Sequence, residues 1–147
     1  MATVNAYLSF KGNCEAAFNL YKSVFGGEFV HISRFNEIPS AEGAPQMTEE
    51  EGNGIMHVSL VFGNNSVLMG SDTSGEWSTS YVAGNNITLS INAESKEEAD
   101  KIFNGLSAGG TITMPMKTEF WGAYFGMCTD KFGILWMVNF DEAQKEN

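Results

Sequence analysis

One helical segment, which occurs twice, constrains the fold of this chain more than any other feature. In residues 13–25 the apolar side chains recur at positions i, i+3, i+4, i+7 and i+8, which lie along one face of an α-helix. Gly26 and Gly27 then end the helix, because glycine tolerates the backbone angles of a C-terminal cap. Apolar strands are predicted on either side of it, at residues 4–10 and 28–35. The segment therefore predicts a β-α-β unit.

The same pattern returns at residues 95–110. Ser95 and Glu98 have the spacing of a capping box, and a similar cap is expected from Asn13 in the first copy. A glycine pair also ends the second copy. The residues that match at an offset of 82 are Glu15 and Glu97, Ala17 and Ala99, Leu20 and Ile102, Tyr21 and Phe103, and Val24 and Leu106. We interpret this match, with the strands around it, as an internal duplication.

Most of the remaining chain is predicted to form strands. They lie at residues 55–62, 66–70, 86–92, 111–117, 123–129 and 134–140. The predicted fold class is α+β, with two βαβββ modules in a single domain that spans residues 1–147. The modules cover about residues 1–72 and 85–141, and residues 73–84 form a linker.

An acidic segment interrupts the first module at residues 37–54. Glutamates, glycines and two prolines leave it few side chains to pack, so a solvated loop is expected. At this length it is either a mobile flap or a disordered insertion.

The net charge of the chain argues against certain classes of partner, and its cysteines indicate a cellular compartment. The formal net charge is −10, which would repel nucleic acid and anionic membranes. No apolar run approaches the roughly 20 residues of a membrane span, and no secretion signal is visible. Cys14 and Cys128 are far apart and lack CxxC spacing, which indicates a reducing, cytoplasmic location. Cys14, at a helix start, is either a reactive thiol or a buried inert one.

Several short motifs carry a resemblance to a known family. They are Tyr7-Leu8-Ser9-Phe10, Gly12-Asn13-Cys14-Glu15-Ala16-Ala17-Phe18, Tyr21 through Gly27, Ile55-Met56-His57, Val67-Leu68-Met69-Gly70-Ser71-Asp72 and Asp130-Lys131-Phe132-Gly133-Ile134-Leu135-Trp136. On these residues the chain resembles the vicinal oxygen chelate superfamily of glyoxalases, bleomycin resistance proteins and dioxygenases. Within it, the chain is similar to the PhnB-like branch, also called 3-demethylubiquinone-9 3-methyltransferase-like. The resemblance implies mixed sheets that curl into open cups, a homodimer, and a divalent metal held by His, Gln or Glu.

The metal positions that the resemblance implies do not carry suitable ligands here. They fall at Ala6, or at Asn5 or Tyr7 with a slip of one residue, and at Met69, Thr88 and Met137. A hard cation prefers oxygen and imidazole donors, which this set does not supply. Nor does a glycine-rich loop join a strand to a helix, as a nucleotide-type cofactor would require. We therefore expect no metal and no organic cofactor.

His57 is the first candidate catalytic residue. It is a polar interruption of an apolar strand and shares a face with Ser59 and Val61. It is either a general base in the first cup or a buried, hydrogen-bonded imidazole. His31 is expected to be a surface residue of its strand, and the two histidines have no metal-binding spacing.

The remaining candidate residues suggest a pocket. Asp72 ends a strand at the expected cup mouth, where it either binds a polar ligand or caps the turn with Thr73 and Ser74. Aromatic rings with one carboxylate suit an apolar or cationic molecule, although such rings also build ordinary cores. The further candidates are Glu119 and Tyr124 for proton transfer, and Trp121, Tyr124, Cys128 and Met137 for ligand contact.

Two functions remain open on the sequence. The first is a metal-free, homodimeric cup that binds a small organic molecule. The second is a lyase, isomerase or dioxygenase-type enzyme of the same superfamily with a non-standard or metal-dependent site. A purely interacting protein would instead have filled cups.

Overall fold

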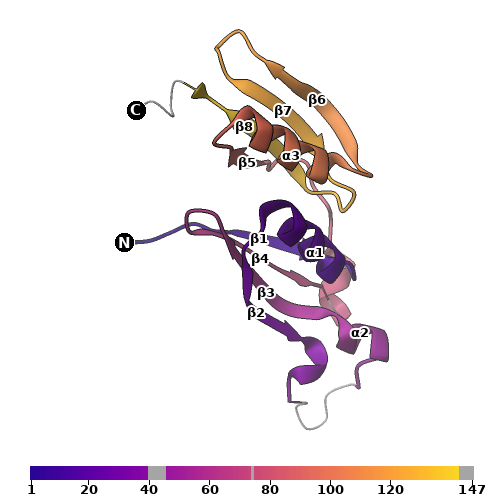
Figure 1. Ribbon diagram of the computed structural model, residues 1–147. Helices are drawn as coiled ribbons and strands as arrows, with labels where there is room; N and C mark the ends of the chain where they lie inside the picture. The colour runs from indigo at the N-terminus through magenta and orange to yellow at the C-terminus, as the bar shows by residue number, and fades with distance from the viewer. Residues whose placement is uncertain (40–45, 74, 143–147) are drawn as a thin grey trace. The chain divides into compact units, whose positions relative to one another are not determined.

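The computed structural model describes residues 1–39, 46–73 and 75–142. The chain divides into two compact units, Met1–Val82 and Ala83–Asn147. Each unit contains one helix that packs on a four-stranded mixed sheet (Figure 1). The α+β prediction, with two βαβββ modules, is therefore confirmed.

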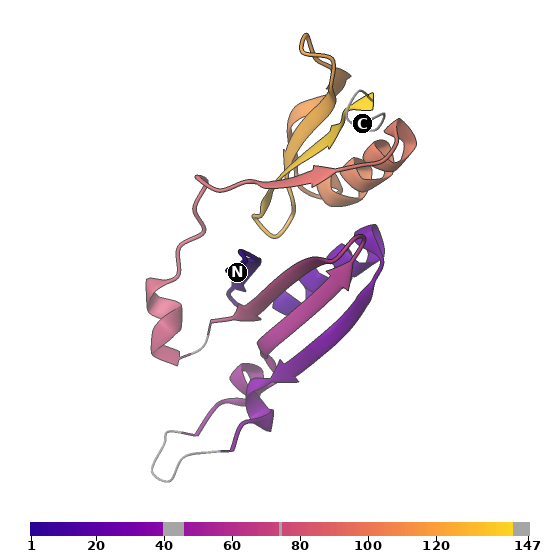
Figure 2. The same cartoon turned by 90° about the vertical axis from the view of Figure 1, so that its left-hand side faces the viewer.

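The first unit is built on the sheet β1-β4-β3-β2. Its elements are β1 (Ala6–Phe10), α1 (Cys14–Phe25), β2 (Glu28–Arg34), β3 (Ile55–Phe62) and β4 (Ser66–Asp72). β1 runs parallel to β4, whereas the β4–β3 and β3–β2 pairs are antiparallel. α1 covers one face of this sheet, which is seen from the other side in Figure 2.

The core of the first unit lies between α1 and its sheet. Phe10, Phe18 and Tyr21 are fully or almost fully buried there. The rings of Phe10 and Phe18 pack edge to face at 6.3 Å, and those of Phe18 and Tyr21 at 5.5 Å. A Cβ on Gly70 would lie 2.7 Å from Phe18 Cε2, so this strand position must be glycine for the helix to approach.

Part of the acidic segment is more ordered than the composition predicts. It contains the 3-10 helix η1 (Phe35–Glu37) and the short helix α2 (Glu49–Asn53). Thr48 caps α2, since its hydroxyl accepts a hydrogen bond from Glu51 N at 3.1 Å. The prediction of one solvated loop over residues 37–54 is thus wrong for these elements, although residues 40–45 lie outside the described residues.

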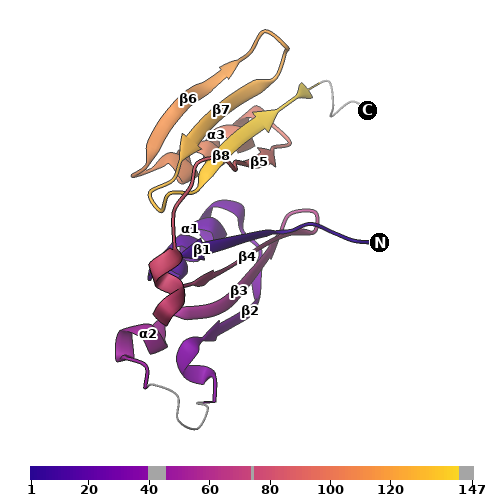
Figure 3. The same ribbon diagram turned by 180° about the vertical axis from the view of Figure 1, so that it is seen from behind.

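The second unit repeats the architecture with the sheet β5-β8-β7-β6 (Figure 3). The 3-10 helix η2 (Gly75–Ser80) follows β4 and still belongs to the first unit. The elements of the second unit are β5 (Leu89–Asn92), α3 (Lys96–Ser107), β6 (Thr111–Thr118), β7 (Tyr124–Thr129) and β8 (Leu135–Phe140). The apolar stripe predicted for α3, Ala99, Ile102, Phe103 and Leu106, is buried.

The two glycine pairs have equivalent roles. A Cβ on Gly27 would lie 2.1 Å from the carbonyl oxygen of Val61, and one on Gly110 would lie 2.2 Å from that of Thr129. In each unit the second glycine therefore lets the helix exit pass directly against a neighbouring strand. This shared close contact supports the duplication inferred from the sequence.

The helix caps differ between the units. Ser95 Oγ accepts a hydrogen bond from Glu98 N at 3.0 Å, as the capping box predicts. Asn13, in contrast, makes no side-chain cap. Its predicted role is taken by Asp72 of β4, whose Oδ1 accepts from Gly12 N and Cys14 N. The prediction for Asn13 is wrong because the capping residue, Asp72, lies 58 positions from Cys14 in the sequence, outside any local pattern.

Candidate functional site

Each sheet has one face covered by its helix and one open face. In the first unit Gly70 faces α1, so the adjacent Met69 points to the opposite, open face. Met69 is paired with Tyr7 of β1 and with Ser59 of β3. Ala6 is paired with Leu68 and thus faces the helix. The open face of the first unit is defined here by Tyr7, Ser9, His57, Ser59, Met69 and Ser71.

Tyr7 and the two histidines form a cluster on this open face. Tyr7 Oη lies 3.4 Å from His57 Nδ1, and the two ring centroids are 5.7 Å apart. The rings of His31 and His57 are 5.2 Å apart, and His31 Nε2 lies 3.2 Å from Ser33 Oγ. Tyr7 remains 48% exposed, whereas Ser33 and Ser59 are buried beside the rings. We call Tyr7, His31, Ser33 and His57 the Tyr–His cluster.

The Tyr–His cluster presents polar atoms that can bind an oxygen-rich molecule. A neutral imidazole has one donor and one acceptor nitrogen, and a phenol or a serine hydroxyl can do both. In the described part of the chain, no protein group hydrogen-bonds His57 Nε2. This nitrogen and the exposed Tyr7 hydroxyl can each donate or accept a hydrogen bond, depending on the imidazole tautomer.

The cluster adds to two interpretations of the sequence. His31 is an exposed residue of its strand, as expected, and antiparallel pairing also places it opposite Ser59 and against the His57 ring. Tyr7 was considered only as a slipped metal position. His57, Ser59 and Val61 do share a face, as their alternation along β3 requires. Only the register between strands shows that Tyr7 and His31 join His57.

The carboxylate of Asp72 is buried and hydrogen-bonded to the backbone. Its side chain is only 6% exposed. Oδ1 accepts from Gly12 N at 2.9 Å and Cys14 N at 3.0 Å, and Oδ2 accepts from Ile55 N at 2.8 Å. Both oxygens are thus engaged by backbone amides of two other segments. The structure therefore supports neither of the two roles considered for Asp72, ligand contact or a local turn cap. Instead, its carboxylate links backbone segments that are distant in the sequence.

The candidate residues of the second unit divide between two faces. Tyr124 Oη donates to Asp100 Oδ1 of α3 at 2.6 Å, so Tyr124 faces the helix. Cys128 is on the same face as Tyr124 by alternation and is buried. Met137 belongs to the other face, where it is paired with Met127. The set Trp121, Tyr124, Cys128 and Met137 therefore does not converge on one pocket.

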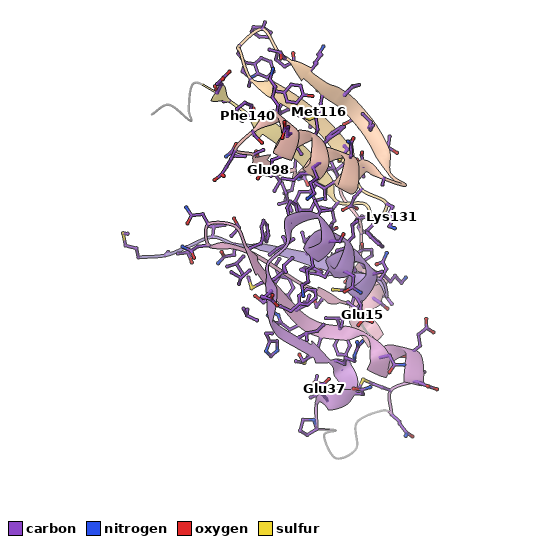
Figure 4. All side chains as sticks on the ribbon, viewed as in Figure 1. Glu15, Glu37, Glu98, Met116, Lys131 and Phe140 are labelled. Carbon is purple, nitrogen blue, oxygen red and sulfur yellow. The ribbon has the colours of Figure 1, made fainter. Side chains whose placement is uncertain are left out.

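The open face of the second unit carries methionine and aromatic side chains together with polar ones such as Lys117. Lys117 is opposite Phe125, and Phe125 packs against Trp121 at 5.8 Å. Met114, Met127 and Met137 continue this face along the strands. Met116, labelled in Figure 4, lies instead on the helix side, where its sulfur would be 2.5 Å from a Cβ on Gly126.

Two thiols and one phenol among the described residues have raised pKa values, each for a local reason. Burial, and secondarily the nearby Asp72 and Glu15 carboxylates, raise the pKa of the Cys14 thiol. Burial and then Asp130 raise the pKa of Cys128 to about 11. The hydrogen bond to Asp100 raises the pKa of Tyr124. Both thiols therefore stay protonated near neutral pH, which supports the inert alternative for Cys14.

Comparison with known families accounts for this architecture. Residues 2–139 match the family model described as 3-demethylubiquinone-9 3-methyltransferase. The chain belongs to this family. Protein YjdN of Escherichia coli (strain K12) is 33% identical to it over 141 residues, which cover 92% of this chain and 93% of that protein.

Solved structures of PhnB-like and glyoxalase-like proteins are similar over nearly the whole chain. Protein PA1353 from Pseudomonas aeruginosa is 36% identical, with a TM-score of 0.78 and coverage of 96% of this chain and 98% of that one. The PhnB protein from Bacillus cereus is 26% identical, with a TM-score of 0.74 and coverage of 95% and 99%. A glyoxalase/bleomycin resistance protein/dioxygenase family enzyme from Burkholderia phytofirmans PsJN shares the fold at 16% identity and a TM-score of 0.59, with coverage of 93% and 98%. The PhnB-like chain thus has the glyoxalase-like fold.

The residues of this PhnB-like chain do not fit the metal centre that the superfamily implies. The implied positions Met69 and Met137, with Tyr7 in place of the helix-facing Ala6, lie on the open faces, and Thr88 comes directly before β5. None of them supplies an imidazole or a carboxylate. Within residues 1–39, 46–73 and 75–142, no group of three or more His, Cys, Asp or Glu could hold a metal ion. No step of a mechanism is therefore assigned to a metal.

The described residues also include no glycine-rich loop that could bind the methyl donor suggested by the family name. The glycine pairs end helices against strands, and Gly26 N is already bonded to Lys22 O at 2.8 Å. Neither sheet is the parallel, doubly wound sheet that binds nucleosides at a strand-to-helix turn.

Among the described helices, none has both the length and the apolar character needed to cross a bilayer.

Proposed function

We propose that this PhnB-like protein binds a small organic molecule at the Tyr–His cluster without a metal cofactor. The observation that carries the proposal is the convergence of Tyr7, His31 and His57 from three strands on one exposed face. Tyr7 Oη and an imidazole N–H are donors for ligand oxygen atoms, and the three rings supply apolar contact area. Buried Ser33, whose Oγ lies 3.2 Å from His31 Nε2, supports the orientation of that ring.

Imidazole NMR tests the proposal directly, because the chain contains only two histidines. Protein labelled with 15N-histidine is titrated with benzoate, catechol and pyruvate, which present carboxylate, phenolic or keto-acid oxygens. At least one probe is expected to shift the signals of both His31 and His57, and Tyr7→Phe should weaken that binding about tenfold, the loss of one good hydrogen bond. Tyr124→Phe is the matched control, since Tyr124 faces α3 in the other unit.

Two results would contradict the proposal. The first is that no probe shifts either imidazole, or that Tyr7→Phe binds as the wild type does. The second concerns the absence of a metal: stoichiometric Zn, Fe, Mn or Ni in protein purified without chelator would overturn that part.

Catalysis by the same residues is the alternative that the Tyr7–His57 contact favours. A phenol 3.4 Å from an imidazole nitrogen provides a short path for proton transfer to a bound molecule. An enzyme of this kind would lose turnover of a screened substrate on His57→Gln while it retained binding. Turnover that His57→Gln leaves unchanged would eliminate this alternative.

A further inference from the structure

The connection between β6 and β7 presents a carboxylate and aromatic rings at one end of the second open face. The turn is closed by Glu119 N, which donates to Ala123 O at 2.8 Å, and by Gly122 N, which donates to Glu119 O at 2.9 Å. Lys117 is opposite Phe125, so Glu119 opposite Ala123 is on the same face by alternation. Glu119, Trp121 and Phe125 are called the aromatic–carboxylate corner below.

Glu119 contains a buried oxygen atom without a hydrogen-bond partner. Its side chain is only 11% exposed, and among the described residues no donor reaches Oε1. The nearest cation is Lys117 Nζ at 3.9 Å, beyond hydrogen-bond distance, on a largely exposed side chain. A buried carboxylate oxygen is costly to leave unpaired, so this atom requires a donor that the described chain does not provide.

The rings beside Glu119 remain accessible. Trp121 is 52% exposed although it packs on Phe125 at 5.8 Å. Phe120, which is almost fully exposed, contacts the Trp121 ring edge to face at 5.0 Å. The faces of aromatic rings attract cations, and an exposed indole does so most strongly. A carboxylate oxygen without a hydrogen-bond partner and accessible rings therefore favour the same class of ligand.

We propose that the aromatic–carboxylate corner binds an organic cation with an apolar body. The ammonium group donates to Glu119 Oε1, and the apolar body lies on Trp121 and Phe125 and extends toward the methionines of the same face. The net charge of −10 further favours a cation over an anion. Lys117 occupies the vicinity of the carboxylate in the free protein and competes with the incoming cation. This site is separate from the Tyr–His cluster and lies in the other unit.

Tryptophan NMR with a matched pair of probes tests the site. The chain has three tryptophans, so 15N-tryptophan labelling gives three indole signals, and Trp121→Leu identifies the relevant one. The probes are 2-phenylethylammonium and 2-phenylethanol, which share their apolar body and differ in charge. We expect the ammonium to shift the Trp121 signal and to bind at least fivefold more tightly than the alcohol.

Two substitutions of opposite effect isolate the charge. Glu119→Gln should weaken binding of 2-phenylethylammonium at least fivefold, whereas Lys117→Gln should strengthen it because the competing cation is removed. Glu97→Gln, on the exposed surface of α3, is the matched control and should leave the affinity for 2-phenylethylammonium unchanged.

Equal affinity for both probes would overturn the proposal, as would wild-type affinity in Glu119→Gln. If Glu119→Gln does not fold, Lys117→Gln decides: unchanged or weaker binding contradicts the proposal. Tyr7→Phe separates this site from the Tyr–His cluster, since it should leave 2-phenylethylammonium binding unchanged.

Discussion

Substitution of Asp72 should destabilise the first unit more than any exposed carboxylate substitution. The Asp72 side chain joins three segments, because it accepts hydrogen bonds from Gly12 N, Cys14 N and Ile55 N at 2.8–3.0 Å. Asp72→Ala removes the acceptor and leaves these backbone donors without it. Asp72→Asn keeps the shape but replaces one acceptor oxygen with an amide that faces a donor.

The size of the effect follows from the number and type of hydrogen bonds lost. A hydrogen bond to a carboxylate contributes about 1.5–3 kcal/mol, and an unsatisfied buried donor costs about 1–3 kcal/mol. Such contributions are not additive, and water will reach some of the freed amides. We therefore expect Asp72→Ala to lower the free energy of unfolding by about 4 kcal/mol, and Asp72→Asn by about 2 kcal/mol.

Urea unfolding followed by far-UV circular dichroism measures the loss, and amide hydrogen exchange locates it. Exchange should accelerate most at Gly12, Cys14 and Ile55, the three donors. Asp100→Asn is the matched control: Asp100 accepts one exposed hydrogen bond from Tyr124, so a loss of no more than about 1 kcal/mol is expected. If Asp72→Ala costs no more than Asp100→Asn, or if the three amides stay protected, the assigned role of Asp72 is wrong.

Two further predictions concern the helix exit and the thiols. Gly26 and Gly27 both have positive φ, but only Gly27 has a strand carbonyl within 2.1 Å of an added Cβ. In urea unfolding, Gly26→Ala should therefore lower the free energy of unfolding by about 1 kcal/mol and Gly27→Ala by about 3 kcal/mol or more. Equal losses for the two variants would contradict this account. Both cysteines should resist Ellman's reagent at pH 8 in the native protein and react fully in 6 M guanidinium, because burial raises their pKa. The Cys128 pKa rises from 9.0 to about 11 on folding, so the unfolded state releases its proton first and stability should fall as the pH increases through that interval; Cys128→Ala should lessen the fall, and rapid native labelling at pH 8 would refute the burial argument.

The fold could be predicted from the sequence because its signals are local. The apolar spacing of residues 13–25 and 95–107 requires neighbours only three or four positions apart, and the helices α1 and α3 form where that spacing predicts them. Ser95 and Glu98 lie within one turn, so their cap could be read directly. The glycine pairs mark helix ends in both copies, and the repeat itself indicated two similar units.

The sites depended on strand register, which the sequence alone did not determine. A slip of one residue moves a side chain to the other face of a sheet, and this distinguishes helix-facing Ala6 from Tyr7, which contacts His57. Asp72 and Cys14 are 58 positions apart, so no local pattern could assign that cap. Tyr124 and Met137 likewise belong to opposite faces because Tyr124 bonds to α3. The sequence thus determined the helices, their ends and the repeat, whereas only the tertiary structure decided which polar side chains meet, because that depends on pairing between distant strands.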